Sequence, residues 1–414
     1  MRKMTADVAV VGGGAAGMLA AITAAERGLR VVLFEKNPYV GRKLGITGKG
    51  RCNITNHCDI KAFMENVPTN GRFLYSAVSG FTPEDAMAFF EGLGIRLKVE
   101  RGNRVFPVSD KAAEVVGLMR EKLRTCGVPI VHERVVDIEL EGGAVSAVVT
   151  ESARCSCASA IVCTGGLSYS KTGSTGDGYR FAEKAGHRII EPKPSLVPLE
   201  CAETFCGEMQ GLSLKNVCLS VYNGKGKRVF SELGEMLFTH YGVSGPLVLS
   251  ASAHMRDFQK DHYTISLDLK PGLDKKKLDQ RILRDFEKYA NRDFGNALGD
   301  LANRLMIPVL VRRSGIPPET KVHSITKEQR ANLLELFKNF RLDVSGPRPV
   351  EEAIVTSGGV DVKEIDPKTM ESKHAKGLYF AGEIIDVDAY TGGFNLQIAW
   401  STGRAAGMHV EAKR

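Results

Sequence analysis

Short apolar runs that lead into glycine recur along the chain. The first, at residues 7–11, is rich in β-branched side chains and leads into Gly-x-Gly-x-x-Gly at residues 12–17. An alanine-rich stretch follows to residue 27, and residues 30–34 form a second apolar run that ends at Glu35. Continuous apolar runs are typical of parallel strands buried on both faces. The pattern therefore predicts strand, helix and strand in the order of a βαβ unit.

Each position of this unit has a physical role. Gly12 permits the tight turn, Gly14 lets backbone amides approach a pyrophosphate, and Gly17 allows the helix to pack closely on the strand. The N-terminus of the helix offers unpaired N–H groups to phosphate. Glu35 is placed to accept hydrogen bonds from ribose hydroxyls. We therefore predict a dinucleotide site.

The uncharged run at residues 8–25 has the length of a membrane span or of a signal-peptide core. However, it contains several glycines, and Asp7 and Glu26 flank it directly. These features favour the nucleotide-binding unit, and we expect no stable membrane association.

The next segment indicates that the resident dinucleotide is FAD. The sequence contains no second complete fingerprint, so it offers no separate fold for a nicotinamide nucleotide. Residues 41–56 form a polar, cationic loop. In it, Arg42 and Lys43 are placed to neutralise phosphate, and Gly48 and Gly50 give an aromatic ring access to backbone amides.

The C-terminal segment supports the same choice. Residues 377–383 form an apolar strand that ends in Glu383, and the chain then turns through Gly392-Gly393 into a helix. A carboxylate at a strand end suits ribityl hydroxyls. A helix N-terminus near Asn395 and Leu396 suits the flavin pyrimidine edge, where negative charge develops on reduction. The alternative is a sheet edge that the C-terminal helix merely covers.

Periodicity predicts the remaining elements. Residues 160–166 form another strand that ends in glycine, and residues 171–178 form a second glycine loop that opens a helix. Residues 217–222 and 263–269 are expected strands. Residues 274–305 are an expected helix, with an apolar stripe of core residues at Leu278, Ile282, Phe286 and Tyr289.

Several of these segments carry a resemblance to a known family. The chain resembles the YhiN/BaiN-type flavoproteins, NAD(P)/FAD-dependent oxidoreductases that include ribosomal-RNA dihydrouridine synthases and bile-acid-type enone reductases. Lys49 stands where the family often has glycine, a departure expected to change little beyond local charge. The motifs that carry the resemblance are GRKLGITGKGRCNITN (41–56), RVFPVSDKA (104–112), KTGSTGDG (171–178), GEMLFTHYGVSGP (234–246), IDPKTMESK (365–373) and AGEIIDVDAYTGGFNLQIAWSTG (381–403).

The resemblance implies an α/β fold with a discontinuous, Rossmann-like FAD-binding domain at residues 1–190 and 350–414. A β-rich substrate domain at 191–349 would be inserted, with a helical subdomain at about 272–340. No metal site is predicted. The expected FAD-binding residues are Gly12, Gly14, Ala15, Ala16, Gly17, Glu35, Lys36, Arg42, Lys43, Gly48, Gly50, Arg51, Val135, Thr164, Gly165, Gly382, Glu383, Gly393, Asn395 and Leu396.

The implied chemistry is hydride transfer from reduced FAD to a polarised C=C bond, with NAD(P)H as a transient reductant. Such a reaction needs an acid for the neighbouring carbon and a donor that polarises the carbonyl. Cys52 and His240 are the candidate acids, with a buried structural thiol and a structural histidine as the alternatives. A role for His240 requires the inserted domain to close over the flavin. Arg51 and Asn53 are candidates for orienting the substrate carbonyl.

The positive charge of the chain helps to choose between candidate substrates. The net charge is +8, and Lys275-Lys276-Lys277 with Arg281 and Arg284 forms a basic run on a predicted helix. These cations suit the phosphates of RNA, although solvated lysines explain them equally well. The hypotheses are therefore reduction of a uridine in 23S ribosomal RNA, reduction of a small bile-acid-like enone, and a non-catalytic flavin-binding protein. Nine cysteines without a CxxC pair suggest free thiols and a cytoplasmic protein.

Overall fold

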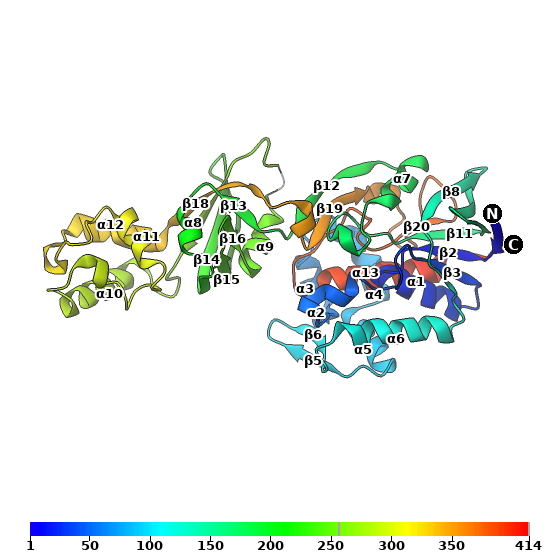
Figure 1. The fold of residues 1–414 in the computed structure, drawn as a ribbon, viewed down its shortest axis with the longest axis horizontal. Coiled ribbons are helices and arrows are strands. Elements are labelled where there is room, and N and C mark those ends of the chain that lie inside the picture. The colour runs from blue at the N-terminus through cyan, green and yellow to red at the C-terminus, as the bar shows by residue number, and fades with distance from the viewer. Residues whose placement is uncertain (256, 413–414) are drawn as a thin grey trace. The chain divides into compact units, whose positions relative to one another are not determined.

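The computed structural model describes residues 1–255 and 257–412 (Figure 1). The chain divides into two compact units. The first comprises residues 1–195 and 349–414, and the second comprises residues 196–348. The first unit is thus built from both ends of the chain.

A five-stranded parallel sheet forms the centre of the first unit, and its apolar strands are almost wholly buried. Val11 is the register partner of Phe34 and of Val162, which in turn pairs with Phe380. The residues that follow these four therefore emerge at one edge of the sheet. In spatial order the strands are β20 (Leu378–Phe380), β11 (Ser159–Val162), β2 (Val8–Val11), β3 (Val31–Phe34) and β7 (Ile130–Val131).

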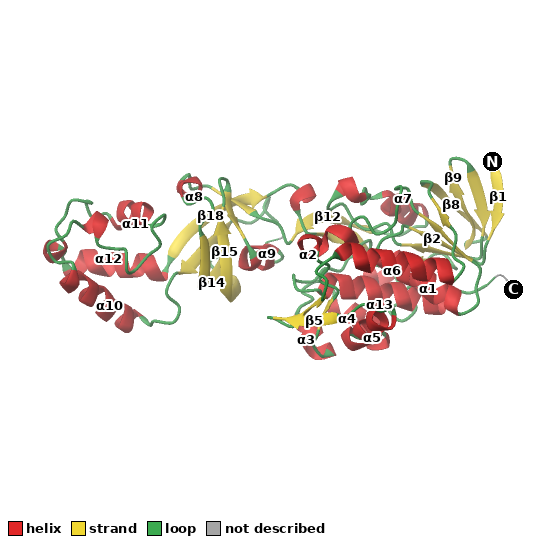
Figure 2. Ribbon diagram, turned by 60° about the horizontal axis from the view of Figure 1, so that its bottom comes forward, coloured by secondary structure: helices red, strands yellow, loops and turns green. Residues whose placement is uncertain are grey.

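Helices α1 (Ala15–Glu26) and α13 (Phe394–His409) lie side by side in both ribbon views (Figures 1 and 2). A Cβ on Gly403 would lie 2.4 Å from the carbonyl oxygen of Ala16, and one on Gly407 would lie 2.6 Å from that of Ala20. The two helices therefore run parallel at close approach, and their N-termini point the same way. Helices α4 (Gly71–Gly80) and α6 (Ala112–Thr125) pack beside them.

Smaller elements complete the first unit. One sheet has the order β1 (Arg2–Thr5), β10 (Ala153–Ser156), β9 (Ala144–Thr150) and β8 (Val135–Glu141). A second has the order β4 (Thr55–Asn56), β6 (Arg104–Pro107) and β5 (Leu97–Glu100). The remaining elements are the pair β12 (Ile189–Ser195) and β19 (Val355–Val360), and helices α2 (Thr47–Gly50), α3 (Ile60–Glu65), α5 (Pro83–Gly92) and α7 (Asp177–Lys184).

A closed barrel with its own hydrophobic core forms the second unit, together with a group of helices. The barrel order is β13 (Leu199–Cys201), β16 (Gly242–Ser244), β15 (Arg228–Phe238), β14 (Ser213–Asn223), β17 (Tyr263–Asp268) and β18 (Phe340–Pro347). The helices are α8 (Phe205–Glu208), α9 (Pro246–Ser252), α10 (Lys275–Lys288), α11 (Ile307–Ser314) and α12 (Lys327–Lys338).

The predicted Rossmann-like α/β fold with a β-rich insertion is confirmed. One element differs: the helix expected over residues 274–305 ends at Lys288. Asn291, Gly295 and Gly299 follow, and they favour turns over helix, so the chain continues as turns with one short 3-10 segment. Leu278, Ile282 and Phe286 are buried as expected. Among the described residues, no helix has the length and apolar character that a membrane crossing needs.

Candidate cofactor site

The first glycine turn leaves a helix N-terminus open. A Cβ on Gly17 would lie only 1.9 Å from the carbonyl oxygen of Gly12, so α1 packs directly onto the turn. A Cβ on Gly14, in contrast, would meet no atom within 4 Å. Gly14 is the N-cap of α1, and no side chain caps this end. The first N–H groups of α1 are therefore available to a phosphate that approaches over Gly14.

Glu35 follows β3 at the same edge of the sheet, and its side chain is held in place. Its Oε2 accepts a hydrogen bond from the Gly13 N–H at 2.8 Å. Its Oε1 accepts from the backbone and side-chain amides of Asn37 at 2.8 and 2.6 Å. Arg42 donates to Asn37 Oδ1 at 2.8 Å and so braces this network. The carboxylate lies directly beside the glycine turn, as a ribose-binding acid requires.

Glu383 follows β20 and forms a polar cluster with residues from three other segments. Lys43 Nζ lies 2.5 Å from its Oε2 and 2.6 Å from Ser168 Oγ. Ser168 Oγ and the Thr356 N–H donate to Glu383 Oε1 at 2.7 and 2.9 Å. Sequence reasoning singled out Lys43 for phosphate and missed Ser168 and Thr356. The structure instead pairs Lys43 with the predicted ribityl-binding acid.

The N-terminus of α13 lies beyond that of α1 along their common direction. Because Ala16 is level with Gly403 and α13 begins at Phe394, the offset is roughly 12 Å at 1.5 Å per residue. The two N-termini therefore suit two different parts of one elongated ligand. Asn395 does not point its amide at a ligand, because it bonds the backbone of Ala389 and Tyr390.

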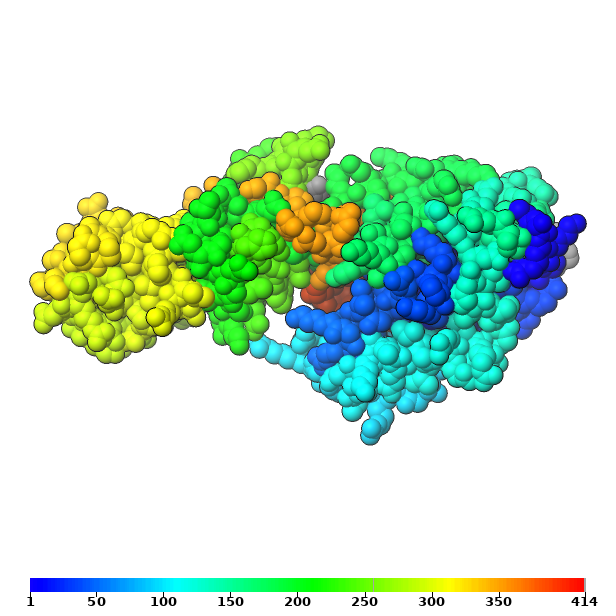
Figure 3. Space-filling view, viewed as in Figure 1, coloured from blue at the N-terminus to red at the C-terminus, as the bar shows by residue number. Residues whose placement is uncertain are grey.

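Side chains that the sequence pattern did not single out fasten the end of the 41–56 loop to α13. Trp400 Nε1 donates to the carbonyl oxygen of Ile54 at 2.9 Å. The Thr55 hydroxyl donates to Gln397 Oε1 at 2.6 Å, and Asn56 Nδ2 donates to the carbonyl oxygen of Gly392 at 3.0 Å. This loop and the N-terminus of α13 thus form one rigid surface. In Figure 3 the blue part of the chain that includes this loop is visible on the surface of the first unit.

Cys52 lies inside this loop. Its side chain is fully buried, and its backbone is left-handed, with φ +62°. Burial raises the pKa of the thiol to about 12. A thiol in this position is protonated at neutral pH but is a weak acid. Its catalytic role stays a prediction.

Two buried polar atoms near the glycine segments have no hydrogen-bond partner among the described residues. They are Thr164 Oγ1, which follows β11, and Asn53 Oδ1 in the loop. Buried polar atoms are normally paired, so Asn53 Oδ1 indicates a missing polar ligand. Thr164 Oγ1 instead lies against Gly178, 2.2 Å from where a Cβ on that glycine would stand. The open glycine turn, the two helix N-termini and the unpaired Asn53 Oδ1 together fit FAD.

Other predicted cofactor residues are occupied within the protein. Lys36 Nζ lies 2.8 Å from Asp177 Oδ2, and so joins β3 to α7. Arg51 forms ion pairs with Glu100 and Asp110 and lies over the ring of Phe106 at 4.1 Å. Gly382 donates its N–H to Thr402 Oγ1 at 2.9 Å. Val135 is buried at the start of β8. Ala15, Ala16 and Gly165 line the glycine turns. Their contacts with a cofactor stay predictions.

His240 belongs to the second unit, in the connection between β15 and β16. Its ring is exposed and lies edge-on to Tyr241, with 4.8 Å between centroids. Its role as an acid stays a prediction.

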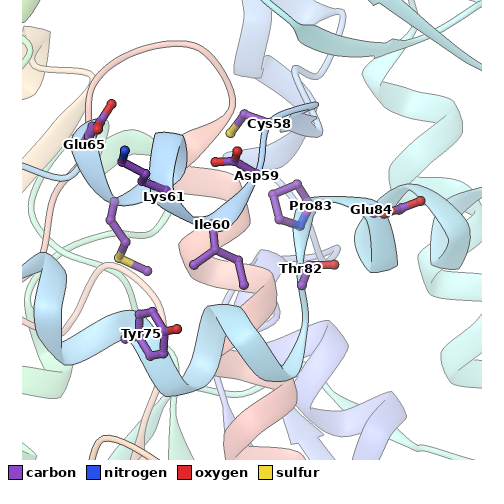
Figure 4. Close-up of a pocket in the computed structure, with 10 residues that line it drawn as sticks. Cys58, Asp59, Ile60, Lys61, Glu65, Tyr75, Thr82, Pro83 and Glu84 are labelled. Atoms are coloured by element: carbon purple, nitrogen blue, oxygen red, sulfur yellow. The ribbon is translucent and has the colours of Figure 1, made fainter.

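A groove of about 850 Å³ lies between α3, α4 and the start of α5 (Figure 4). No predicted cofactor residue lines it, so it is separate from the cofactor site. Cys58 at its edge has a pKa raised by burial to about 11. The lining residues are Cys58, Asp59, Ile60, Lys61, Met64, Glu65, Tyr75, Thr82, Pro83 and Glu84.

This fold and site define a flavoprotein oxidoreductase of the Rossmann type. The model for the HI0933-like protein Rossmann domain matches residues 6–409. A ribosomal RNA dihydrouridine synthase from Haemophilus influenzae is 30% identical over 412 residues, with 97% of each chain covered. A 3-dehydro-bile acid delta(4,6)-reductase from Clostridium scindens is 29% identical over 409 residues, covering 97% of this chain and 98% of that protein.

A solved 3-ketosteroid-delta4-(5alpha)-dehydrogenase from Rhodococcus jostii has the same fold. It aligns with a TM-score of 0.55 at 14% identity, over 99% of this chain and 97% of that one. The chain belongs to the HI0933-like Rossmann family, and it is an FAD-dependent oxidoreductase. The resemblance found in the sequence is thereby confirmed.

Proposed function

We propose that the protein uses NAD(P)H to reduce a polarised C=C bond, and that its substrate is a uridine of 23S ribosomal RNA, which becomes dihydrouridine. FAD, when bound, supplies the hydride-transfer chemistry. The first unit binds the cofactor, residues of both units contact the substrate, and the protein works in the cytoplasm. The full-length similarity to a dihydrouridine synthase is consistent with this assignment.

The observation that carries the choice of RNA is uncompensated positive charge beside the 41–56 loop. Strand β4 of this loop pairs with β6, and Arg104 stands opposite Asn56 in the register. Lys49, Arg101 and Arg104 are all exposed there. Within the part of the chain that the structure describes, none of them has a carboxylate within 4.0 Å. Such cations favour a polyanion, whereas a neutral enone gains nothing from them.

The basic run on α10 offers less free charge. Lys275 Nζ lies 2.5 Å from Glu335, and Arg281 Nε lies 3.0 Å from Asp285. These pairs neutralise part of the run within the protein. We therefore assign the main RNA contact to the β5–β6 hairpin.

Nucleoside mass spectrometry of 23S ribosomal RNA tests the function. We expect deletion of the gene to remove one dihydrouridine and the wild-type protein to restore it. The variant Glu383→Gln should restore less, since this residue is proposed to bind the cofactor. Purified variants are checked for flavin absorbance. An unchanged dihydrouridine content after deletion would overturn the RNA assignment.

Salt dependence tests the hairpin. We expect the double variant Arg101→Ala, Arg104→Ala to weaken RNA binding and to flatten the plot of log affinity against log salt by about 0.7–0.9 for each phosphate that the variant no longer neutralises. The matched control is the double variant Lys276→Ala, Arg284→Ala on α10, for which we expect a smaller change in RNA affinity and in its salt dependence. Equal changes in both double variants would remove the reason for placing RNA at the hairpin.

The second candidate is a small enone, which the similarity to the bile-acid reductase favours. Oxidation of NAD(P)H in the presence of a steroid enone tests it. This activity should be insensitive to salt and to the hairpin variants, so the two candidates are distinguishable in one set of proteins.

A further inference from the structure

Three side chains of the first unit that the cofactor site does not use converge on one point. His187 follows α7, Glu364 ends the 3-10 turn Val362–Glu364, and His374 lies in the loop before β20. His187 Nδ1 lies 3.3 Å from Glu364 Oε2, and His374 Nε2 lies 3.4 Å from the same oxygen. The three ligand atoms all lie within 4.8 Å of one another.

These separations match the edge of a metal tetrahedron. Two ligands at about 2.1 Å from a tetrahedral zinc ion lie about 3.4 Å apart. A direct N–H···O hydrogen bond is shorter, at about 2.9 Å. Each nitrogen is thus spaced from the carboxylate oxygen for a shared ion better than for a direct hydrogen bond, and the two nitrogens lie within 4.8 Å of each other.

His187 supplies a second, independent observation. Its side chain is fully buried, at 0% exposure, yet its Nδ1 has no hydrogen-bond partner among the described residues. A buried imidazole nitrogen without a partner is costly and calls for a ligand. The nitrogen faces Glu364, so the missing partner belongs between these two side chains.

Neighbouring groups fix the ligands. The other nitrogen of His187, Nε2, lies 2.6 Å from Ser372 Oγ, and its ring stands edge-on to Phe380 of β20. The Arg188 N–H donates to Glu364 Oε2 at 2.8 Å. A hydrogen bond to the carboxylate is a usual support of a metal ligand.

We propose that His187, Glu364 and His374 bind a divalent transition-metal ion of the Zn²⁺ type. Two imidazoles and one carboxylate form a known three-ligand set, and the part-exposed side of His374 leaves room for water as the fourth ligand. The ion joins the end of α7 to the 362–374 segment ahead of β20, whose C-terminal end leads to Glu383. The ion is a structural cross-link within the first unit.

Metal analysis of the FAD-loaded protein, purified without a histidine tag and stripped with EDTA, tests the site. After dialysis against ZnCl₂, we expect one Zn²⁺ per chain, and Co²⁺ in its place should give the visible d–d band of a tetrahedral site. Zn²⁺ at a hundredfold excess over its Kd should raise the Tm by roughly 3 °C.

Variants decide whether these residues hold the ion. His374→Ala and Glu364→Gln should each weaken Zn²⁺ binding at least tenfold and remove the Co²⁺ band, while flavin absorbance stays at the wild-type level. The matched control is His262→Ala in the second unit, an exposed histidine 3.9 Å from a single carboxylate of Asp343, which should change nothing. The site would be overturned if both variants bind Zn²⁺ as tightly as the wild type, or if the wild-type protein binds no stoichiometric Zn²⁺.

Discussion

Two glycine-rich turns border the cofactor site, and different constraints shape them. In residues 12–17 the neighbours require glycine, because a Cβ on Gly17 would overlap the carbonyl oxygen of Gly12. In residues 48–52 the backbone conformation favours glycine, since φ is positive at four of the five positions. Gly50 there has open space around its α-carbon. The first turn therefore admits no side chain at Gly17, whereas the second admits Lys49 and Cys52 at a cost in strain.

Gly17→Ala is the strongest test of this contrast. The added methyl group would lie 1.9 Å from a backbone oxygen that cannot move without displacing the turn. We expect a loss of at least about 3 kcal/mol in the free energy of unfolding, together with loss of bound FAD. Urea denaturation and flavin absorbance measure the two effects.

Gly14→Ala is the control for that variant. Its Cβ would meet nothing within 4 Å, and its φ of −79° suits alanine. We expect stability within about 0.5 kcal/mol of wild type but weaker FAD binding, since the methyl group stands where phosphate approaches. A stable, FAD-loaded Gly17→Ala protein would contradict the close packing of α1 on the turn.

The second turn should make its buried thiol inert. With a pKa of about 12, Cys52 at pH 8 carries about a thousandfold less thiolate than an ordinary cysteine. We expect iodoacetamide to modify the part-exposed Cys218 while Cys52 stays unmodified until guanidinium unfolds the protein. Peptide mass spectrometry gives the extent at each residue. Rapid native modification of Cys52 would show that the turn opens, and would strengthen its assignment as the acid.

The ion pair between Lys43 and Glu383 anchors the loop of the second turn. Both side chains are mostly buried, at 22% and 19% exposure. We expect Lys43→Met to lower the free energy of unfolding by about 2 kcal/mol, because it leaves the carboxylate without its cation. A double-mutant cycle with Glu383→Gln should give a coupling of about 1–2 kcal/mol. Lys171→Met, at an exposed lysine, is the control, and zero coupling would show that the pair does not hold the loop.

The parts that sequence predicts well are those set by local pattern. The apolar runs became β2, β3, β11 and β20, and Glu35 and Glu383 stand at strand ends as expected. Burial on both faces requires such runs, and glycine marks the turns after them. Lys49 shows the limit of this reasoning. Its substitution for glycine was expected to alter only charge, yet its φ is +60°.

Contacts between distant segments left no local signal. Trp400 and Gln397 look like core helix residues, and only the fold brings them to the backbone and side chains of the 41–56 loop. No metal site was predicted, because His187, Glu364 and His374 are separated by up to 187 residues and show no ligand spacing. The network around Glu383 likewise needs Thr356, which β19 carries to it. Tertiary pairing, rather than pattern, defines these groups.

Lys49→Gly should change the free energy of unfolding least, and it tests the contrast between the two glycine-rich turns most closely. A left-handed backbone costs a non-glycine residue about 1–2 kcal/mol, and glycine in turn loses about 0.5–1 kcal/mol in unfolded-state entropy. We therefore expect a net stabilisation of about 0.5–1 kcal/mol, measurable by urea denaturation. Lys276→Gly, at an exposed lysine within α10, should destabilise by a similar amount. If both variants destabilise equally, the strain assigned to the second turn is absent, and its glycines would have to be explained by ligand approach alone.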